Sequence, residues 1–220
     1  MNKIREENTL IKKDLIETLR SSVQKVMKED AKLLERGCSE RAIVHWLATY
    51  FLEAAQKVLT VPSPTAFFDH QDGYTVDVEY NRIGSEGESK HLYEQSDRCN
   101  GCDVTEQCVR KPSGRQNDSI MIDMVFHSRS SNKSNQLNPY RDNLLCVEVK
   151  TATSTKAERE CDEERIKILV DRENITKEST KALKEPKYIL GATVYFESPD
   201  KAVIKLFDGS EQPIEIPVFK

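Results

Sequence analysis

The spacing of apolar residues predicts two helices at the start of the chain. In residues 9–35, apolar side chains recur every three or four positions between charged ones, which is the period of an amphipathic helix. Gly37 is expected to end this helix. Ser39 is a suitable N-cap for a second helix, whose apolar stripe runs through residues 43–58.

The remaining apolar runs are typical of strands separated by polar segments. The predicted strands are residues 74–81, 120–127, 144–150, 188–196, 202–207 and 214–219. Two prolines, Pro213 and Pro217, place the last strand at a sheet edge. A capping box from Thr155 to Glu158 opens a helix that is expected to run to about residue 173. Residues 84–119 form a long polar insertion, and residues 128–143 read as a loop rich in Ser and Asn.

Length and composition fit a single α/β domain over residues 1–220. The chain has 220 residues, of which 37% are hydrophobic and 32% charged, so it can build a core. The net charge of -4 gives no overall basic field, and any nucleic-acid surface would have to be local. There is no signal-like segment and no apolar run of membrane-spanning length, so we expect a cytoplasmic protein.

Two of the predicted strands carry charges where apolar residues are expected. Asp123 has apolar neighbours on both sides, and Glu148 and Lys150 follow the apolar residues 144–147. Alternation along a strand places Glu148 and Lys150 on one face. A solvent-exposed strand end would explain Glu148 and Lys150. It fits Asp123 poorly, because Asp123 lies within an apolar run and a buried unpaired charge is costly. A divalent cation shared by Asp123 and Glu148 would account for both strands.

Glu40 is a further candidate, at the start of the second predicted helix. It stands three residues before Ile43 and therefore extends the apolar stripe rather than the wet face. The alternative is an acid that interacts favourably with the helix dipole, worth about 0.3–1 kcal/mol. The residues alone leave both interpretations open.

The insertion contains three of the six cysteines in the chain. Cys99 and Cys102 form a Cys-x2-Cys turn and Cys108 follows, which favours a structural zinc site with His91 as the nearest fourth ligand. Unligated thiols and an iron–sulfur cluster are the alternatives. Cys38, Cys146 and Cys161 lie farther away in sequence, and we expect thiols or metal ligands rather than a disulfide framework.

Four segments together resemble the PD-(D/E)xK nuclease superfamily, which has the restriction-endonuclease-like fold. They are residues 39–43 around Glu40, 77–82, 122–129 around Asp123, and 143–150 with Glu148-Val149-Lys150. The resemblance covers roughly residues 38–207. It implies an αβββαβ core with a central mixed sheet flanked by helices, to which this chain adds an N-terminal helix and the cysteine-containing insertion. The chain departs from the family pattern at Ile122, where the motif's name has proline, and in that insertion.

The resemblance implies a divalent-metal-dependent nuclease that hydrolyses phosphodiester bonds, with DNA as the first expected substrate, RNA as the alternative, and a role in defence or repair. Asp123, Glu148 and the Val149 carbonyl would bind Mg²⁺ or Mn²⁺, and Glu40 would complete the site directly, through a water, or with a second ion. Lys150 would orient the attacking water. A homodimer is a further expectation of the resemblance.

Three basic residues are weaker candidates for contacts with substrate phosphate. His127 and Arg129 continue the strand face of Asp123, and Arg82 follows the first strand. Packing or ion pairing is the alternative for each of them. The alternative function for the whole protein is a catalytically inactive nuclease-fold module that binds nucleic acid or protein through a zinc-stapled insertion.

Overall fold

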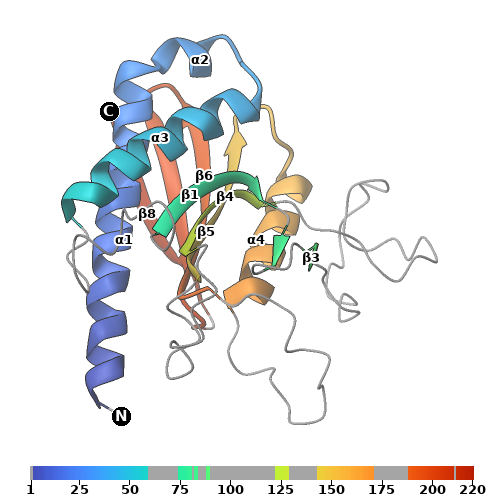
Figure 1. Ribbon diagram of the computed structural model, residues 1–220. Helices are drawn as coiled ribbons and strands as arrows, with labels where there is room; N and C mark the ends of the chain where they lie inside the picture. The colour runs from blue at the N-terminus through green and yellow to red at the C-terminus, as the bar shows by residue number, and fades with distance from the viewer. Residues whose placement is uncertain are drawn as a thin grey trace.

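A six-stranded mixed sheet forms the centre of the computed structural model (Figure 1). In spatial order its strands are β1 (Tyr74–Tyr80), β4 (Ile122–Ser128), β5 (Asn143–Thr151), β6 (Leu190–Ser198), β7 (Lys201–Phe207) and β8 (Ile214–Phe219). Within this sheet β5 and β6 are parallel and the other neighbouring pairs are antiparallel. Strands β2 (Arg82–Ile83) and β3 (Glu88–Ser89) form a separate pair. The structure describes residues 2–58, 74–80, 82–83, 88–89, 122–128, 143–170, 188–210 and 212–220.

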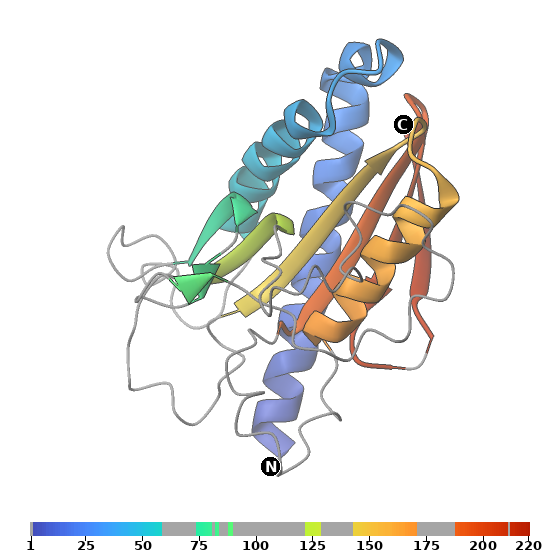
Figure 2. The ribbon, with the colours of Figure 1, turned by 90° about the vertical axis from the view of Figure 1, so that its right-hand side faces the viewer.

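Helices cover both faces of the sheet and divide the core into two parts (Figure 2). Helices α1 (Asn2–Glu29) and α3 (Glu40–Val58) cover one face, where they bury the larger cluster with side chains such as Leu145 and Val147 of β5. Helix α4 (Lys156–Val170) covers the other face, where it buries a smaller cluster that includes Cys146. Among the described helices, none is both long and apolar enough to cross a membrane.

The first predicted helix is present but differs at both ends from the prediction of one helix over residues 9–35. It begins at Asn2, and it is interrupted at Asp30, before the short helix α2 (Ala31–Glu35). Asp30 has φ -117° and ψ 24°, outside the helical region, and its carboxylate accepts a 2.7 Å hydrogen bond from the Tyr50 hydroxyl of α3. The link to α3 gives Asp30 a partner outside its own helix. Gly37 then ends the segment with a φ of 59°, as predicted for a helix C-terminus.

The strand predictions are confirmed, including β8 at the sheet edge. The capping box is also confirmed: the Thr155 amide donates to Glu158 Oε2 at 2.7 Å and the Glu158 amide donates to Thr155 Oγ1 at 3.2 Å. An α/β domain with a mixed sheet and flanking helices is therefore established. Residues beyond Val170, where this helix was expected to continue, lie outside the described part of the chain.

A glycine in β6 allows α4 to approach the sheet closely. A Cβ at Gly191 would overlap Ile166 Cγ2 and lie 2.7 Å from Val170 Cγ2, both on α4. Any larger residue would push the helix away from the strands. The same helix also carries Asp162 and Arg165, which form ion pairs with residues of β5.

We expect Gly191→Ala to lower the free energy of unfolding by about 1–3 kcal/mol, because the added methyl group overpacks the contact with α4. Denaturant unfolding measures this change. The same substitution in an Ile166→Ala background should cost less, since one of the opposing side chains is then shortened. An equal cost in both backgrounds would contradict the close-contact explanation.

Candidate active site

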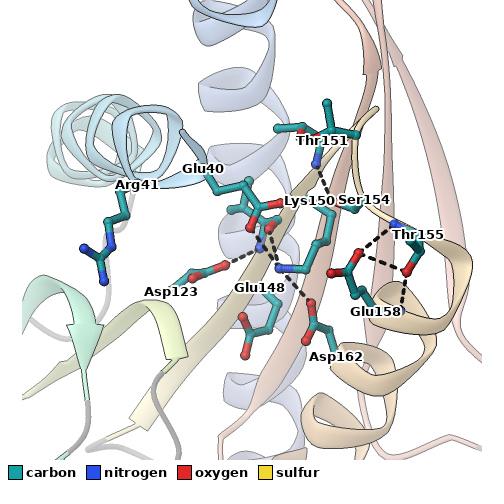
Figure 3. A network of polar contacts seen from close by, with 12 residues as sticks. Glu40, Arg41, Asp123, Glu148, Lys150, Thr151, Ser154, Thr155, Glu158 and Asp162 are labelled. Atoms are coloured by element: carbon teal, nitrogen blue, oxygen red, sulfur yellow. Dashed lines mark hydrogen bonds and ion pairs between the residues drawn. The ribbon is translucent and has the colours of Figure 1, made fainter. Parts of the chain in front are cut away.

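The register of β4 and β5 brings two acids together on the face that α4 covers. Met124 pairs with Val147 and Val125 pairs with Cys146, so the antiparallel register leads from there to Asp123 and Glu148. The carboxylate of Asp123 accepts a 2.8 Å hydrogen bond from the backbone amide of Val149 (Figure 3). Two acids predicted from separate strands are therefore neighbours in the fold.

Glu148 is a buried carboxyl group with an unengaged oxygen. The residue is 2% exposed, and Oε1 has no hydrogen-bond partner among the residues that the structure describes. Burial is the largest cause that raises the pKa of Glu148 from 4.5 to about 8; the Arg165 cation opposes this rise and the adjacent Asp123 contributes to it. The nearest guanidinium nitrogen of Arg165 lies 3.7 Å from Oε1. A buried polar oxygen of this kind calls for a partner, such as a water molecule or a cation.

Lys150 lies at the meeting point of α3, β5 and α4. Its ammonium donates to Glu40 Oε2 at 3.0 Å and to the Val149 carbonyl at 3.3 Å, and lies 3.1 Å from Asp162 Oδ2. The side chain is 17% exposed, so the charged group is partly desolvated. These three oxygens match the three donors of an ammonium group and hold it in one position.

Glu40 uses both carboxylate oxygens within the protein. Oε2 accepts from Lys150, and Oε1 accepts a 2.9 Å hydrogen bond from the Ser154 hydroxyl. Its place in the first turn of α3 also agrees with the helix-dipole interpretation, and the two interpretations are compatible. The next residue, Arg41, points away from the cluster toward β1, where it pairs with Glu79 at 2.5 Å (Figure 3). In this arrangement Glu40 holds Lys150.

Helix α4 adds two residues that sequence reasoning missed. Asp162 is 2% exposed and forms ion pairs with Lys150 and with Arg165. A signal for Asp162 was available: it shares the helical stripe of Ile166 and Leu169, which are buried against the sheet, so an acid occurs where an apolar residue is expected. Arg165 lies one turn further along, and its i,i+3 spacing from Asp162 is the corresponding signal.

Among the weaker phosphate candidates, His127 has a described side chain, which meets Asp77 of β1. His127 is buried, and its Nε2 lies 2.8 Å from Asp77 Oδ2 on β1. Arg129 lies outside the described residues, as does the side chain of Arg82, whose backbone belongs to β2. The packing and ion-pair alternative therefore describes what His127 does here, and the phosphate contacts stay predictions.

The cysteine site falls on residues that the structure does not describe, namely His91, Cys99, Cys102 and Cys108. Of the more distant cysteines, Cys146 is buried, with its Sγ 3.9 Å from the Leu190 carbonyl oxygen. Cys161 is disulfide-bonded, which corrects the expectation of a thiol or metal ligand at this position. The zinc site stays a prediction.

The described residues contain no group of three or more His, Cys, Asp and Glu side chains arranged to hold a metal ion. Both carboxylate oxygens of Glu40 are engaged, one by Lys150 and one by Ser154. What remains for a cation is the pair Asp123 and Glu148, with the Glu148 oxygen that has no partner among the described residues. Hard oxygen donors of this kind suit Mg²⁺ or Mn²⁺. The chemistry of these two carboxylates therefore fits such an ion, although they do not form a group of three acids.

No protein-family model, curated protein or solved structure matches this chain. The established class is therefore the coarse one: an α/β domain with a six-stranded mixed sheet and a buried cluster of acids and cations at β4, β5 and α4.

We expect Glu148→Gln to stabilise the protein in chelator-containing buffer, because the substitution removes a buried charge that lacks a hydrogen bond. The folded-state pKa of Glu148 is about 8 against an ordinary 4.5, so the stability that this group contributes is full at low pH and is lost as the pH rises toward 8. The gain from the substitution should therefore grow between pH 5 and pH 8. Thermal unfolding across this range measures it, and a gain that is constant or falls with pH would contradict this explanation.

Proposed function

We propose that this protein is a divalent-metal-dependent nuclease of the PD-(D/E)xK type, with Asp123, Glu148 and Lys150 as its catalytic residues. One observation carries the proposal. Residues from α3, β4 and β5 that the motif predicts to act together are linked by contacts, from Asp123 to the Val149 amide at 2.8 Å and from Lys150 to Glu40 at 3.0 Å. Two adjacent carboxyl groups with an ammonium group beside them are a recurring arrangement for phosphoryl chemistry that depends on a metal.

The element order supports the proposal. Reading α3, β1, β4, β5, α4 and β6 along the chain gives the αβββαβ order expected of the restriction-endonuclease-like core. The candidate residues occupy the start of α3, the middle strand β4 and the end of β5, which is where the motif requires them. Strands β7 and β8 and helix α1 would then be additions to that core.

Asp123 and Glu148 would hold the ion, with the Val149 carbonyl as the third protein ligand. When bound, Mg²⁺ or Mn²⁺ would acidify a water molecule and offset negative charge on the scissile phosphate. Glu148 offers an oxygen without a hydrogen bond, and Asp123 is fixed by the Val149 amide. Because Glu40 is committed to Lys150 and Ser154, we propose a single ion.

Lys150 would supply the fixed positive charge at the reacting phosphate. Its ammonium is held by Glu40, Asp162 and the Val149 carbonyl, so little reorganisation is needed before reaction. Glu40 and Ser154 would act on this lysine rather than on the substrate. The network thus fixes the position of the cation before the substrate arrives.

The substrate class within this proposal is DNA, which follows from the resemblance alone. The net charge of -4 means that binding would depend on a local basic surface. An inactive module usually loses some of these charges, whereas this chain keeps Asp123, Glu148 and Lys150, which favours catalysis over the inactive-module alternative. We therefore keep catalysis as the proposal.

We expect Lys150→Ala to reduce Mg²⁺- or Mn²⁺-dependent cleavage of plasmid, linear or single-stranded DNA by about 100-fold or more, because it removes a preorganised charge at the phosphate. RNA in the same assay tests the substrate class. Lys205→Ala is the matched control: Lys205 is also a strand lysine paired with two carboxylates, Glu163 and Glu215, but these belong to a different cluster. Equal activity of the two variants, or no cleavage by the wild type, would refute the assignment.

We expect Glu40→Gln to lower cleavage while leaving the Mn²⁺ affinity within about twofold of wild type, because Glu40 holds Lys150 and is not a metal ligand. Calorimetric titration with Mn²⁺ checks the affinity. Asp123→Asn is the comparison and should weaken Mn²⁺ binding strongly. A similar loss of affinity in Glu40→Gln would place Glu40 among the ligands instead.

A further inference from the structure

Three buried side-chain atoms lack a hydrogen-bond partner among the described residues, and all three lie in one cluster. They are Glu148 Oε1, Asp162 Oδ2 and Arg165 Nε. Native proteins satisfy most buried polar atoms, so a group of exceptions in one place calls for an explanation. The Glu148 oxygen is accounted for by the ion proposed above. The Asp162 oxygen lies 3.1 Å from the Lys150 ammonium and is compensated by that ion pair. The Arg165 atom has no such partner among the described residues.

The contacts of Arg165 are unequal. Its guanidinium makes a close ion pair with Asp162 Oδ1, whereas the nearest nitrogen lies 3.7 Å from Glu148 Oε1. The second contact is within ion-pair range but is too long for a hydrogen bond. Asp162 therefore holds the arginine in position. The positive charge of Arg165 acts on Glu148 without a hydrogen bond to Oε1, so this oxygen stays available to a ligand.

This arrangement addresses a conflict at Glu148. A buried carboxylate needs a compensating positive charge, but a hydrogen-bonded partner would occupy the oxygen that a metal ion requires. Arginine suits this task because its charge is delocalised and it keeps its proton under all ordinary conditions. The Arg165 side chain is 22% exposed, against 3% for the acids, so the cation reaches inward from the protein surface.

We propose that Arg165, anchored by Asp162, is a built-in counter-cation for Glu148, a positioning residue that neutralises the buried acid while leaving its oxygen available. Only the metal-binding consequence of this inference rests on the proposed function. A fixed cation beside Glu148 also repels an incoming divalent ion. The site would therefore bind free metal weakly.

A double-mutant cycle tests the counter-cation without any metal. In chelator-containing buffer at about pH 9.5, where Glu148 is ionised, Arg165→Met should lower the thermal midpoint by about 6 °C or more, because it leaves buried acids uncompensated. The gain in midpoint from Glu148→Gln should be larger in the Arg165→Met background than in the wild type. Arg165→Lys should restore most of the midpoint. An equal gain in both backgrounds would overturn the inference.

Arg159 provides the matched control for charge removal on the same helix. It donates to the Ser154 carbonyl at 3.0 Å and stacks on the Tyr195 ring. In an Arg159→Met background the gain from Glu148→Gln should equal that in the wild type. A larger gain there as well would mean that any lost charge on α4 has the effect, which would contradict a specific role for Arg165.

Calorimetric titration with Mn²⁺ tests the consequence for metal binding. Arg165→Met should bind Mn²⁺ about tenfold more tightly or better, because a repelling charge is removed, while Arg165→Lys should stay near wild type. Asp162→Asn should bind Mn²⁺ more weakly, since it releases the Arg165 cation toward Glu148. A merely structural role for the pair would weaken binding in both Arg165→Met and Asp162→Asn, which would overturn the inference. If the wild type binds no Mn²⁺, the proposed function fails, and the stability cycle still decides the role of Arg165.

Discussion

Charged side chains are buried between helix α4 and strands β4 and β5, and the fold has to compensate these charges. Asp123 and Glu148 are on neighbouring strands beneath α4, where water cannot solvate them fully. Burial of like charges is unfavourable, so the fold surrounds them with Lys150 and Arg165, which α3 and α4 hold through Glu40 and Asp162. The cluster joins elements that are distant in sequence. The unfavourable free energy of burying Asp123 and Glu148 has an explanation if these two acids bind a divalent cation.

Each element of the fold contributes to this cluster by ordinary packing. The larger core fixes α1 and α3 on one face of the sheet, and this sets the start of α3 near the end of β5. Gly191 lets α4 lie close to β6, which brings the polar turn of that helix over β5. The Thr155–Glu158 capping box starts α4 directly after Ser154, the residue that bonds Glu40. Apolar packing thus determines where the charges meet.

Much of the fold followed from the chain's periodicity, because strands and helices are local patterns. The predicted strands and the capping box are in place, whereas the break at Asp30 depends on Tyr50 and could not be read locally. In the candidate site, Asp123, Glu148 and Lys150 were detectable as charges in apolar runs. The commitment of both Glu40 oxygens was not, because Ser154 reaches it only in three dimensions. Asp162 had a visible signal in the stripe of α4 that was not recognised.

We propose that Asp123 and Glu148 together hold a divalent cation beside Lys150. Anomalous scattering from crystals soaked in Mn²⁺ would locate the ion directly. We expect a single peak in contact with Asp123, Glu148 and the Val149 carbonyl, with Lys150 still held by Glu40. A peak elsewhere, or an ion bound through Glu40 instead of Glu148, would contradict it.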